Sequence, residues 1–365
     1  MKKVNPRLIP VIVTLVVLMT MQMVWAAPIT PITAPGISAP LRDNGNKILK
    51  MKVPVEEWEK IFGIMDSNDF GISVQQTTDG GYIITGYTSL REPQDVNYGN
   101  GWTTEPSKPD IYLVKTGANG NKQWEKTFGG AKSDEGHFVQ QTTDGGYIII
   151  GSTNSTGAGG MDVYMIKTGA GGSKQWERTF GGAKSDEGYS VRQTIDGGYI
   201  IAGATASSGA GNNDVYLVKT DASGNTQWEK SFGGVLTDEG YSVQQTSDGG
   251  YIIAGKAALL GSPDLYLIKI KMEDYKPSVP TPLTISNITS TPGAPAVEWE
   301  KTFKHSSGND YGNSVQQTPD GGYIITGYTT PSLDSWYSMD HGVPELVSPD
   351  SNVYLVKTSA DGSNI

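Results

Sequence analysis

One six-residue motif, Asp-Gly-Gly-Tyr-Ile-Ile, occurs five times in this chain of 365 residues. A Trp-Glu pair precedes each copy, and a Tyr-(Leu/Met)-(Val/Ile)-Lys run follows each copy. The central copies begin 52 residues apart, at Asp144, Asp196 and Asp248, while the intervals to Asp79 and Asp320 are longer because of insertions. Such spacing indicates repeated units, each of which must bury its apolar surface against its neighbours.

Each repeat predicts four short strands. In the third repeat they cover residues 188–194, 199–203, 214–220 and 227–232. The Asp-Gly-Gly segment and a second glycine-containing segment favour tight hairpins, because glycine accepts positive φ, so all four strands are expected to pair antiparallel, each with the next. A sheet with two apolar faces must be covered on both, so we expect an all-β fold in which the four-stranded units stack as β-propeller blades.

The two ends of the repeat region predict how such a ring closes. The region begins with a Trp-bearing segment, residues 56–62, and ends after the third strand of the last repeat, residues 352–358. We expect five blades, with residues 56–62 paired beside residues 352–358, because this pairing removes two exposed sheet edges. The alternative is a four-blade module followed by the start of a second, since a Pro/Thr/Ser-rich insertion over residues 271–297 precedes the fifth repeat.

Residues 1–26 predict an export signal. Positive charges precede an uncharged apolar run over residues 8–24, and Ala26 offers a cleavage site. This run is shorter than the roughly 20 residues of a spanning helix, although an uncleaved membrane anchor is the alternative. A Pro-rich linker over residues 27–54 then leads to the repeats over residues 55–365. We therefore expect a secreted or cell-surface protein without a membrane span after cleavage.

Charge and composition exclude several classes of partner and site. The formal net charge is −10, and an acidic surface repels phosphate backbones, which excludes nucleic acid as a partner. The chain has no cysteine, so disulfides and thiolate metal sites are absent. We expect no cofactor apart from Ca²⁺, which oxygen ligands suit.

The order of motifs resembles a known repeat family. Trp-Glu-Lys-Thr-Phe-Gly-Gly, Asp-Glu-Gly-Tyr-Ser-Val, Gln-Thr-x-Asp-Gly-Gly-Tyr-Ile-Ile-Ala-Gly and Asp-Val-Tyr-Leu-Val-Lys-Thr follow one another. This series is similar to the short β-propeller repeats of secreted and surface proteins of archaea and bacteria. The match is fullest over residues 123–269 and extends over about residues 55–360. The resemblance implies a propeller fold and an extracellular location, and it supplies no catalytic residues.

An Asp-Glu pair recurs ahead of the first strand in three repeats. Paired carboxylates can hold Ca²⁺ or act as acid and base. The chain has no Asp-x-Asp-x-Asp-Gly loop, and three near-identical copies do not make one active site. The alternative is a solvated turn in which the aspartate accepts backbone hydrogen bonds. The candidate metal ligands are Asp134, Glu135, Asp186, Glu187, Asp238 and Glu239.

Two insertions interrupt the repeats at the same place, between the second and third strands of repeats one and five. Both contain aromatic residues, and in a closed five-blade ring they would lie side by side. Non-repeated aromatic loops on a rigid scaffold favour ligand binding, although loops that pack on their own blade are the alternative. The candidate ligand-binding residues are Tyr98, Trp102, Trp336, Tyr337 and His341.

No motif in the chain predicts catalysis. There is no Gly-x-Ser-x-Gly elbow, phosphate loop or dinucleotide fingerprint. Asn154 and Asn287 begin sequons that matter in a host that glycosylates exported proteins. We expect a non-enzymatic scaffold that binds a surface glycan, a polymer or a protein. The alternatives are a carbohydrate-active hydrolase or lyase and a purely structural envelope protein.

Overall fold

The computed structural model describes residues 57–90, 108–259, 262–272, 295–304, 309–330, 337–340, 343–346 and 352–363. Every regular element in these residues is a β-strand, which confirms the expected all-β class. The predicted signal and the Pro-rich linker lie outside the described residues. No helix long and apolar enough to cross a bilayer occurs in the part of the chain that the structure describes.

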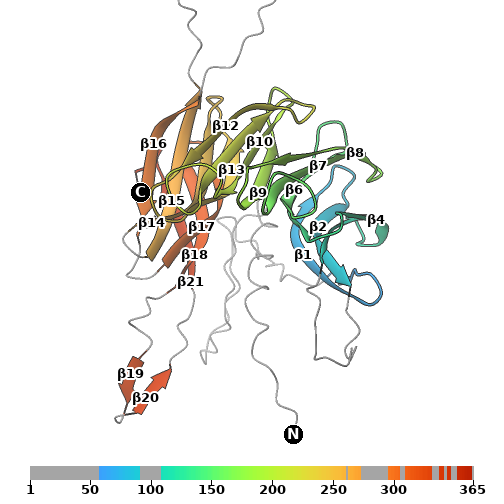
Figure 1. Cartoon of the computed structure of the whole chain (residues 1–365), viewed down its shortest axis with the longest axis horizontal. Coiled ribbons are helices and arrows are strands. Elements are labelled where there is room, and N and C mark those ends of the chain that lie inside the picture. Colours follow the sequence, from blue (N-terminus) through green and yellow to red (C-terminus); the bar gives the residue numbers. More distant parts are fainter. Residues whose placement is uncertain are drawn as a thin grey trace, which may run out of the picture.

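Five sheets follow one another along the chain, and we number them 1 to 5 in chain order (Figure 1). Sheet 1 consists of β1 (Ser67–Gln76), β2 (Tyr82–Leu90), β3 (Asp110–Thr116) and β4 (Lys122–Phe128). Sheet 2 consists of β5 (Asp134–Gln141), β6 (Tyr147–Thr153), β7 (Asp162–Thr168) and β8 (Lys174–Phe180). Sheet 3 consists of β9 (Asp186–Gln193), β10 (Tyr199–Thr205), β11 (Asp214–Thr220) and β12 (Thr226–Phe232).

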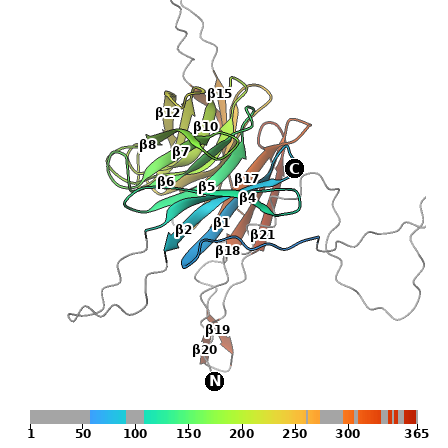
Figure 2. The same cartoon turned by 90° about the vertical axis from the view of Figure 1, so that its right-hand side faces the viewer.

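The last two sheets differ from the first three in strand length or strand number. Sheet 4 consists of β13 (Asp238–Gln245), β14 (Tyr251–Leu259), β15 (Ser262–Met272) and β16 (Pro295–Phe303). Sheet 5 has three strands, β17 (Asn309–Gln317), β18 (Tyr323–Thr330) and β21 (Asn352–Thr358). A separate hairpin of β19 (Tyr337–Asp340) and β20 (Val343–Leu346) lies between β18 and β21 in the chain and projects away from the sheets (Figures 1 and 2).

All neighbouring strands are antiparallel and follow chain order, as the hairpin motifs predict. The first strand of each sheet therefore forms one edge, and we call β1, β5, β9, β13 and β17 the inner strands. The Trp-bearing fourth strands form the opposite edge in sheets 1 to 4. The five sheets lie side by side in an arc, with sheet 1 at one end and sheet 5 at the other (Figure 1).

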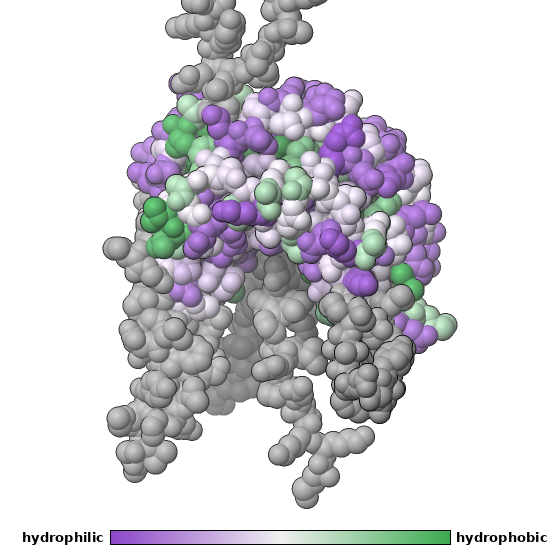
Figure 3. All heavy atoms as spheres, in the orientation of Figure 1, coloured by the Kyte–Doolittle hydropathy of each residue, from purple (hydrophilic) through white to green (hydrophobic). Residues whose placement is uncertain are grey.

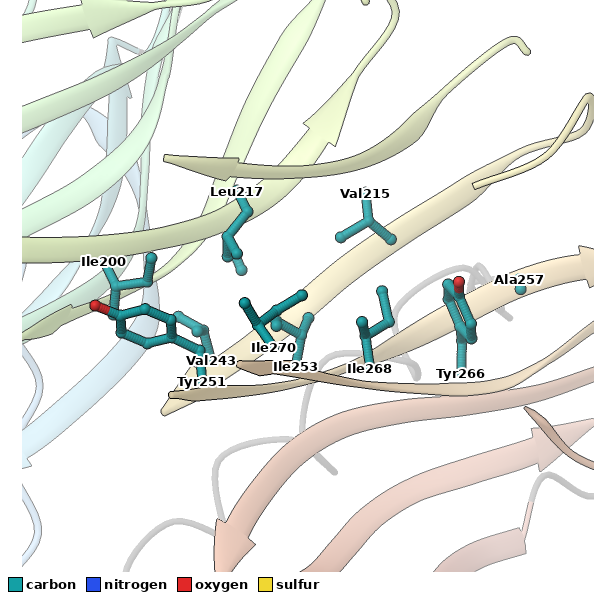
Figure 4. Packing of buried hydrophobic residues seen from close by; sticks show 11 residues of the cluster. Ile200, Val215, Leu217, Val243, Tyr251, Ile253, Ala257, Tyr266, Ile268 and Ile270 are labelled. Atoms are coloured by element: carbon teal, nitrogen blue, oxygen red, sulfur yellow. The ribbon is translucent and has the colours of Figure 1, made fainter. Parts of the chain in front are cut away.

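Apolar side chains fill the four spaces between successive sheets. Leu217 of β11 and Ile253 of β14 pack between sheets 3 and 4 (Figure 4). Because side chains alternate along a strand, Ile200 faces sheet 4 while its neighbour Ile201 faces sheet 2. Complete burial of such a side chain contributes about 1.5–3 kcal/mol. Contact between sheets is therefore the main source of stability in this fold.

A lysine on the third strand ties two of the repeated motifs together in each sheet, and this lysine is buried in sheets 1 to 4. In sheet 2, Lys167 Nζ lies 2.9 Å from Asp144 Oδ2 of the Asp-Gly-Gly turn, and it also donates to the carbonyl of Thr168 and to Gln175. The ammonium thus joins the turn between strands one and two to strands three and four. The equivalent ion pairs are Lys115–Asp79, Lys219–Asp196, Lys269–Asp248 and Lys357–Asp320.

Sheet 5 continues the array instead of starting a separate module. Tyr323 and Ile325 of sheet 5 pack with Leu265 and Leu267 of sheet 4 in one buried cluster. The strands on either side of the Pro/Thr/Ser-rich insertion pair with each other, so this insertion interrupts sheet 4. The structure does not favour the alternative of a four-sheet module followed by the start of a second.

The segment predicted to close the ring differs from the expectation. Residues 57–64 are described and form no strand, and β21 has no fourth strand beside it within the described residues. The indole of Trp58 nevertheless packs on Tyr82, just as Trp124 packs on Tyr147 in the next sheet. Trp58 therefore occupies the place of an outer-strand tryptophan in front of sheet 1.

Candidate functional site

The inner strands carry a row of aromatic side chains that passes from sheet to sheet. His137 of β5 lies 5.6 Å from Tyr189 of β9, and Tyr189 lies 5.3 Å from Tyr241 of β13, between ring centroids. Lys256 Nζ lies 5.8 Å from the ring centroids of both Tyr241 and Tyr311, which extends the row to sheet 5. We call this row, with the three further rings described next, the inner-strand aromatic band.

The two end sheets add stacked aromatic pairs to this band. Phe70 and Tyr87 in sheet 1 are cross-strand partners with ring centroids 4.8 Å apart. Tyr311 and Tyr328 in sheet 5 hold the same register positions, 4.5 Å apart. The equivalent pairs in sheets 2, 3 and 4 are Glu135–Ser152, Glu187–Ala204 and Glu239–Lys256. Stacked rings thus occur at this position in sheets 1 and 5 and not in the three sheets between them.

Carboxylates accompany the aromatic band. Glu187 accepts a hydrogen bond from the Tyr189 hydroxyl at 2.9 Å, and Glu239 accepts one from Tyr241 at 2.7 Å. Burial, followed by the charge of these carboxylates, raises the pKa of both phenols well above the usual range. Lys256 also forms an ion pair with Glu239 at 3.0 Å. The band therefore combines flat apolar rings with acceptor oxygens.

Part of the band is accessible to a ligand. Phe70 is 38% exposed and Tyr328 is 37% exposed, and both are large hydrophobic side chains. Phe70, Phe62, Ile84 and Tyr112 also line a cavity of about 90 Å³ on the outer face of sheet 1. Much of the described surface in the Figure 3 view is hydrophilic or neutral, with separate apolar patches. Phe70 and Tyr328 are the two aromatic side chains among the ten exposed large hydrophobic residues of the described part of the chain.

The predicted Asp-Glu pairs separate into two roles, because adjacent residues of a strand point to opposite faces. The glutamates belong to the inner-strand band, as Glu187 and Glu239 show. The aspartates are buried instead, and Asp134 and Asp186 are both 0% exposed. Asp134 accepts from the backbone N–H of Gly130, as the turn alternative predicts, but it is not solvated. No group of three or more His, Cys, Asp or Glu side chains converges as a metal site in the described residues.

Most of the other predicted site residues lie outside the described residues. This applies to Tyr98, Trp102, Trp336, His341 and Asn287, while Tyr337 lies in β19. The two insertions do connect strands two and three of sheets 1 and 5, as predicted. Asn154, the first residue of the other sequon, is half-buried at the end of β6, where its N–H donates to Ser133.

The sequence patterns missed the aromatic pairs of sheets 1 and 5. The available signal was the departure from the repeat: Phe70 and Tyr311 replace the glutamate of the Asp-Glu pairs. An aromatic residue within a strand ordinarily indicates packing, and only the register shows that each has an aromatic partner across the strand.

Comparisons with known proteins assign no family. No family model and no curated protein matches the chain. A protein of unknown function from Dyadobacter fermentans is similar in structure, with a TM-score of 0.41 and 12% identity over 80% of this chain and 91% of that one. Sqt1 from Chaetomium thermophilum has a TM-score of 0.37 and 10% identity over 71% and 68% of the two chains. A mannose phosphorylase from Leishmania mexicana has a TM-score of 0.31 and 10% identity over 73% and 81%.

Proposed function

We propose that this chain is a secreted or cell-surface five-bladed β-propeller that binds a glycan through the inner-strand aromatic band and the two insertions. The observation that carries the proposal is the placement of stacked aromatic pairs in the two sheets that also carry aromatic insertions. Ring closure would make these two sheets neighbours. Secretion is supported by the signal pattern of residues 1–26.

Closure is supported by an exposed apolar face on sheet 5 and by the apolar cavity on the outer face of sheet 1. Val353 and Leu355 of β21 are 71% and 47% exposed, whereas the equivalent Ile111 and Leu113 of β3 are both 0% exposed against sheet 2. On the outer face of sheet 1, Ile84 and other apolar side chains line the cavity described above. The fifth junction would then be built from the same residue positions as the other four.

Trp58 supports the same closure. Its ring lies over Gly120, where an added Cβ would lie 2.7 Å from the indole, and Trp124 lies over Gly172 in the same way. The register of β3 with β4 pairs Lys115 with Trp124. By repetition, Lys357 of β21 would pair with Trp58, which gives sheet 5 its fourth strand.

The proposed seam between blades five and one is weaker than the other junctions. In each internal junction, a backbone N–H of one sheet donates to a glutamine of the next; Ile195, for example, donates to Gln245 at 2.9 Å. Pro319 holds the equivalent position in sheet 5 and has no N–H to donate. A seam without this bond, flanked by both insertions, is a suitable place for a ligand to enter.

The aromatic band favours a glycan as the ligand. Flat rings such as Phe70 and Tyr328 offer apolar faces to the C–H faces of sugars, and the glutamates accept hydrogen bonds from sugar hydroxyls. The net charge of −10 disfavours acidic polymers. The proposed ligand class is therefore a neutral or amino-sugar polysaccharide. The carboxylates of the band recur from sheet to sheet, which favours binding over the hydrolase alternative.

Binding is tested with immobilised neutral, amino-sugar and acidic polysaccharides. We expect the chain to be retained by a neutral or amino-sugar polymer, and Phe70→Ala with Tyr328→Ala to reduce retention at least about tenfold. Ile195→Ala is the matched control, because Ile195 is 88% exposed on a turn outside the band. Retention that survives the double substitution, or retention by none of the polymers, would contradict the proposal. Release of soluble sugar during the assay would favour the hydrolase alternative.

Closure is tested separately by a disulfide, because the chain has no cysteine of its own. Lys60→Cys with Leu355→Cys places two thiols on the proposed partner positions, where cross-strand Cα atoms lie about 4.5–5.5 Å apart. We expect an intramolecular disulfide. Disulfide-linked oligomers would indicate head-to-tail association between chains instead. Ile195→Cys with Leu355→Cys is the control that forms no intramolecular bond.

A further inference from the structure

Buried or half-buried aspartates face one another where successive sheets meet. Asp110 begins the third strand of sheet 1, and Asp134 begins the first strand of sheet 2. Gly129 lies close to both carboxylates: a Cβ added to this glycine would be 2.0 Å from Asp110 Oδ1 and 2.7 Å from Asp134 Oδ2. The same arrangement surrounds Gly181 and Gly233, so the pairs form a series. The series is Asp110/Asp134, Asp162/Asp186, Asp214/Asp238 and Asp264/Asp310.

The first pair has oxygen atoms without partners. Asp134 Oδ2 accepts from Gly130 N at 2.8 Å and from Ser155 Oγ at 2.7 Å. Asp134 Oδ1 and Asp110 Oδ1 are buried and accept no hydrogen bond. Asp134 as a whole is 0% exposed. Burial and the charge of Asp134 raise the pKa of Asp110. Two facing carboxylates that each have a buried oxygen without a hydrogen-bond partner are unfavourable, so this junction favours a positive charge or a proton.

The fourth junction shows how the chain supplies positive charge. Lys304 replaces the glycine that precedes the other pairs, following Phe303 as Gly129 follows Phe128. Lys304 Nζ lies 3.6 Å from Asp264 Oδ1 and forms an ion pair with it. Lys304 therefore places a cation beside one aspartate of the pair at this junction.

The position that would face Asp69 in a closed ring carries no charge. Asn352 pairs with Thr329 in the register in which Asp110 pairs with Thr88. Asparagine therefore replaces the first aspartate of the pair at this one position. The chain thus has an amide in place of one aspartate at the proposed closing junction, a lysine in place of glycine at the fourth junction, and neither change at the first three junctions.

We propose that a divalent cation of the calcium class binds between Asp110 and Asp134, and between the equivalent pairs Asp162/Asp186 and Asp214/Asp238. One such ion neutralises both carboxylates, which approach Gly129 so closely that any side chain there would overlap them. Because only two carboxylates meet at each junction, hydroxyl, carbonyl and water oxygens complete the shell, which is the donor set that Ca²⁺ accepts. The ion joins two sheets, so it stabilises their contact and not the ligand band.

The test uses the full chain after treatment with EDTA, with Ca²⁺ alone as the probe. Calorimetric titration is expected to show about three bound ions per chain, and Ca²⁺ is expected to raise the midpoint of thermal unfolding. Asp110→Asn, which copies the residue at position 352, is expected to reduce this number to about two. Asp264→Asn is the matched control: it makes the same change at the junction that already has Lys304, and the number of ions should not change.

Several outcomes would overturn the proposal. Absence of calcium binding and of any calcium-dependent shift in the unfolding midpoint of the unsubstituted chain would do so, independently of the variants. Equal loss in Asp264→Asn and Asp110→Asn would show that the binding does not depend on the glycine junctions. Undiminished binding in a folded triple variant, with Asp110, Asp162 and Asp214 all changed to Asn, would assign the ions to surface carboxylates. Stability that rises on mild acidification without responding to Ca²⁺ would show that each pair shares a proton.

Discussion

The indole of Trp58 packs edge-on against Tyr82, with ring centroids 5.6 Å apart and ring planes at 64°. Trp124 makes the same contact with Tyr147, at 5.7 Å and 60°. The two contacts are equivalent although β4 holds Trp124 within a sheet and Trp58 precedes the first strand. A tryptophan at this position therefore packs on a tyrosine of the sheet that follows it, whether or not the tryptophan itself lies in a paired strand.

Trp58→Ala should lower the free energy of unfolding by about 2 kcal/mol, because it removes an aromatic contact and leaves space above Gly120. Urea unfolding followed by circular dichroism measures this change. Trp124→Ala is the reference within a complete sheet. An unchanged midpoint for Trp58→Ala would show that this segment adds nothing to sheet 1.

Lys167→Met should destabilise the chain by about 2 kcal/mol. The lysine side chain is 4% exposed, and its ammonium bonds Asp144, the Thr168 carbonyl and Gln175. Methionine has a similar length but leaves these acceptors without their donor. Lys174→Met, which removes an exposed ion pair with Glu177, is the control and should cost less than about 0.5 kcal/mol. Equal effects of the two substitutions would contradict the structural role of the buried lysine.

Acid should weaken the fold through the same turns. Burial raises the pKa of Asp144, but hydrogen bonds from Thr142 and Lys167 outweigh it and lower the pKa to about 2. A depressed folded-state pKa stabilises the fold fully above the unfolded value, near pH 4, and this contribution is lost as the pH falls through about 2. Urea midpoints measured from about pH 5 down to about pH 2 should therefore decrease. Lys167→Met should make that decrease shallower, and an equally steep decrease would argue against this ion pair as its source.

Two glycines of sheet 3 should respond differently to substitution. An added Cβ at Gly203 would lie 1.9 Å from the carbonyl oxygen of Glu187, so Gly203→Ala should cost about 2 kcal/mol or more. Gly197 has a φ of 80° with open space around it, and asparagine tolerates that conformation. Gly197→Asn should therefore cost about 1 kcal/mol or less. Thermal unfolding of both variants compares the two, and the reverse order would contradict the assignment.

The repeating units follow from local sequence patterns alone. Glycine turns, alternating apolar residues and a fixed interval specify four antiparallel strands in each of the first four sheets, because hairpin pairing depends on residues close together in the chain. The strands predicted for the third repeat agree closely with β9 to β12. The repeat pattern also predicts that both insertions lie between strands two and three of their sheets, and the order of the strands agrees.

Which side chains meet across sheets depends on how the sheets pack in three dimensions. The sequence paired Asp134 with its neighbour Glu135, yet the strand directs them to opposite faces and brings Asp134 to Asp110 of the preceding repeat. It likewise stacks Phe70 on Tyr87 across a strand pair. Contacts of this kind depend on register and on the packing of one sheet against the next, and a repeat pattern along a single chain does not specify them.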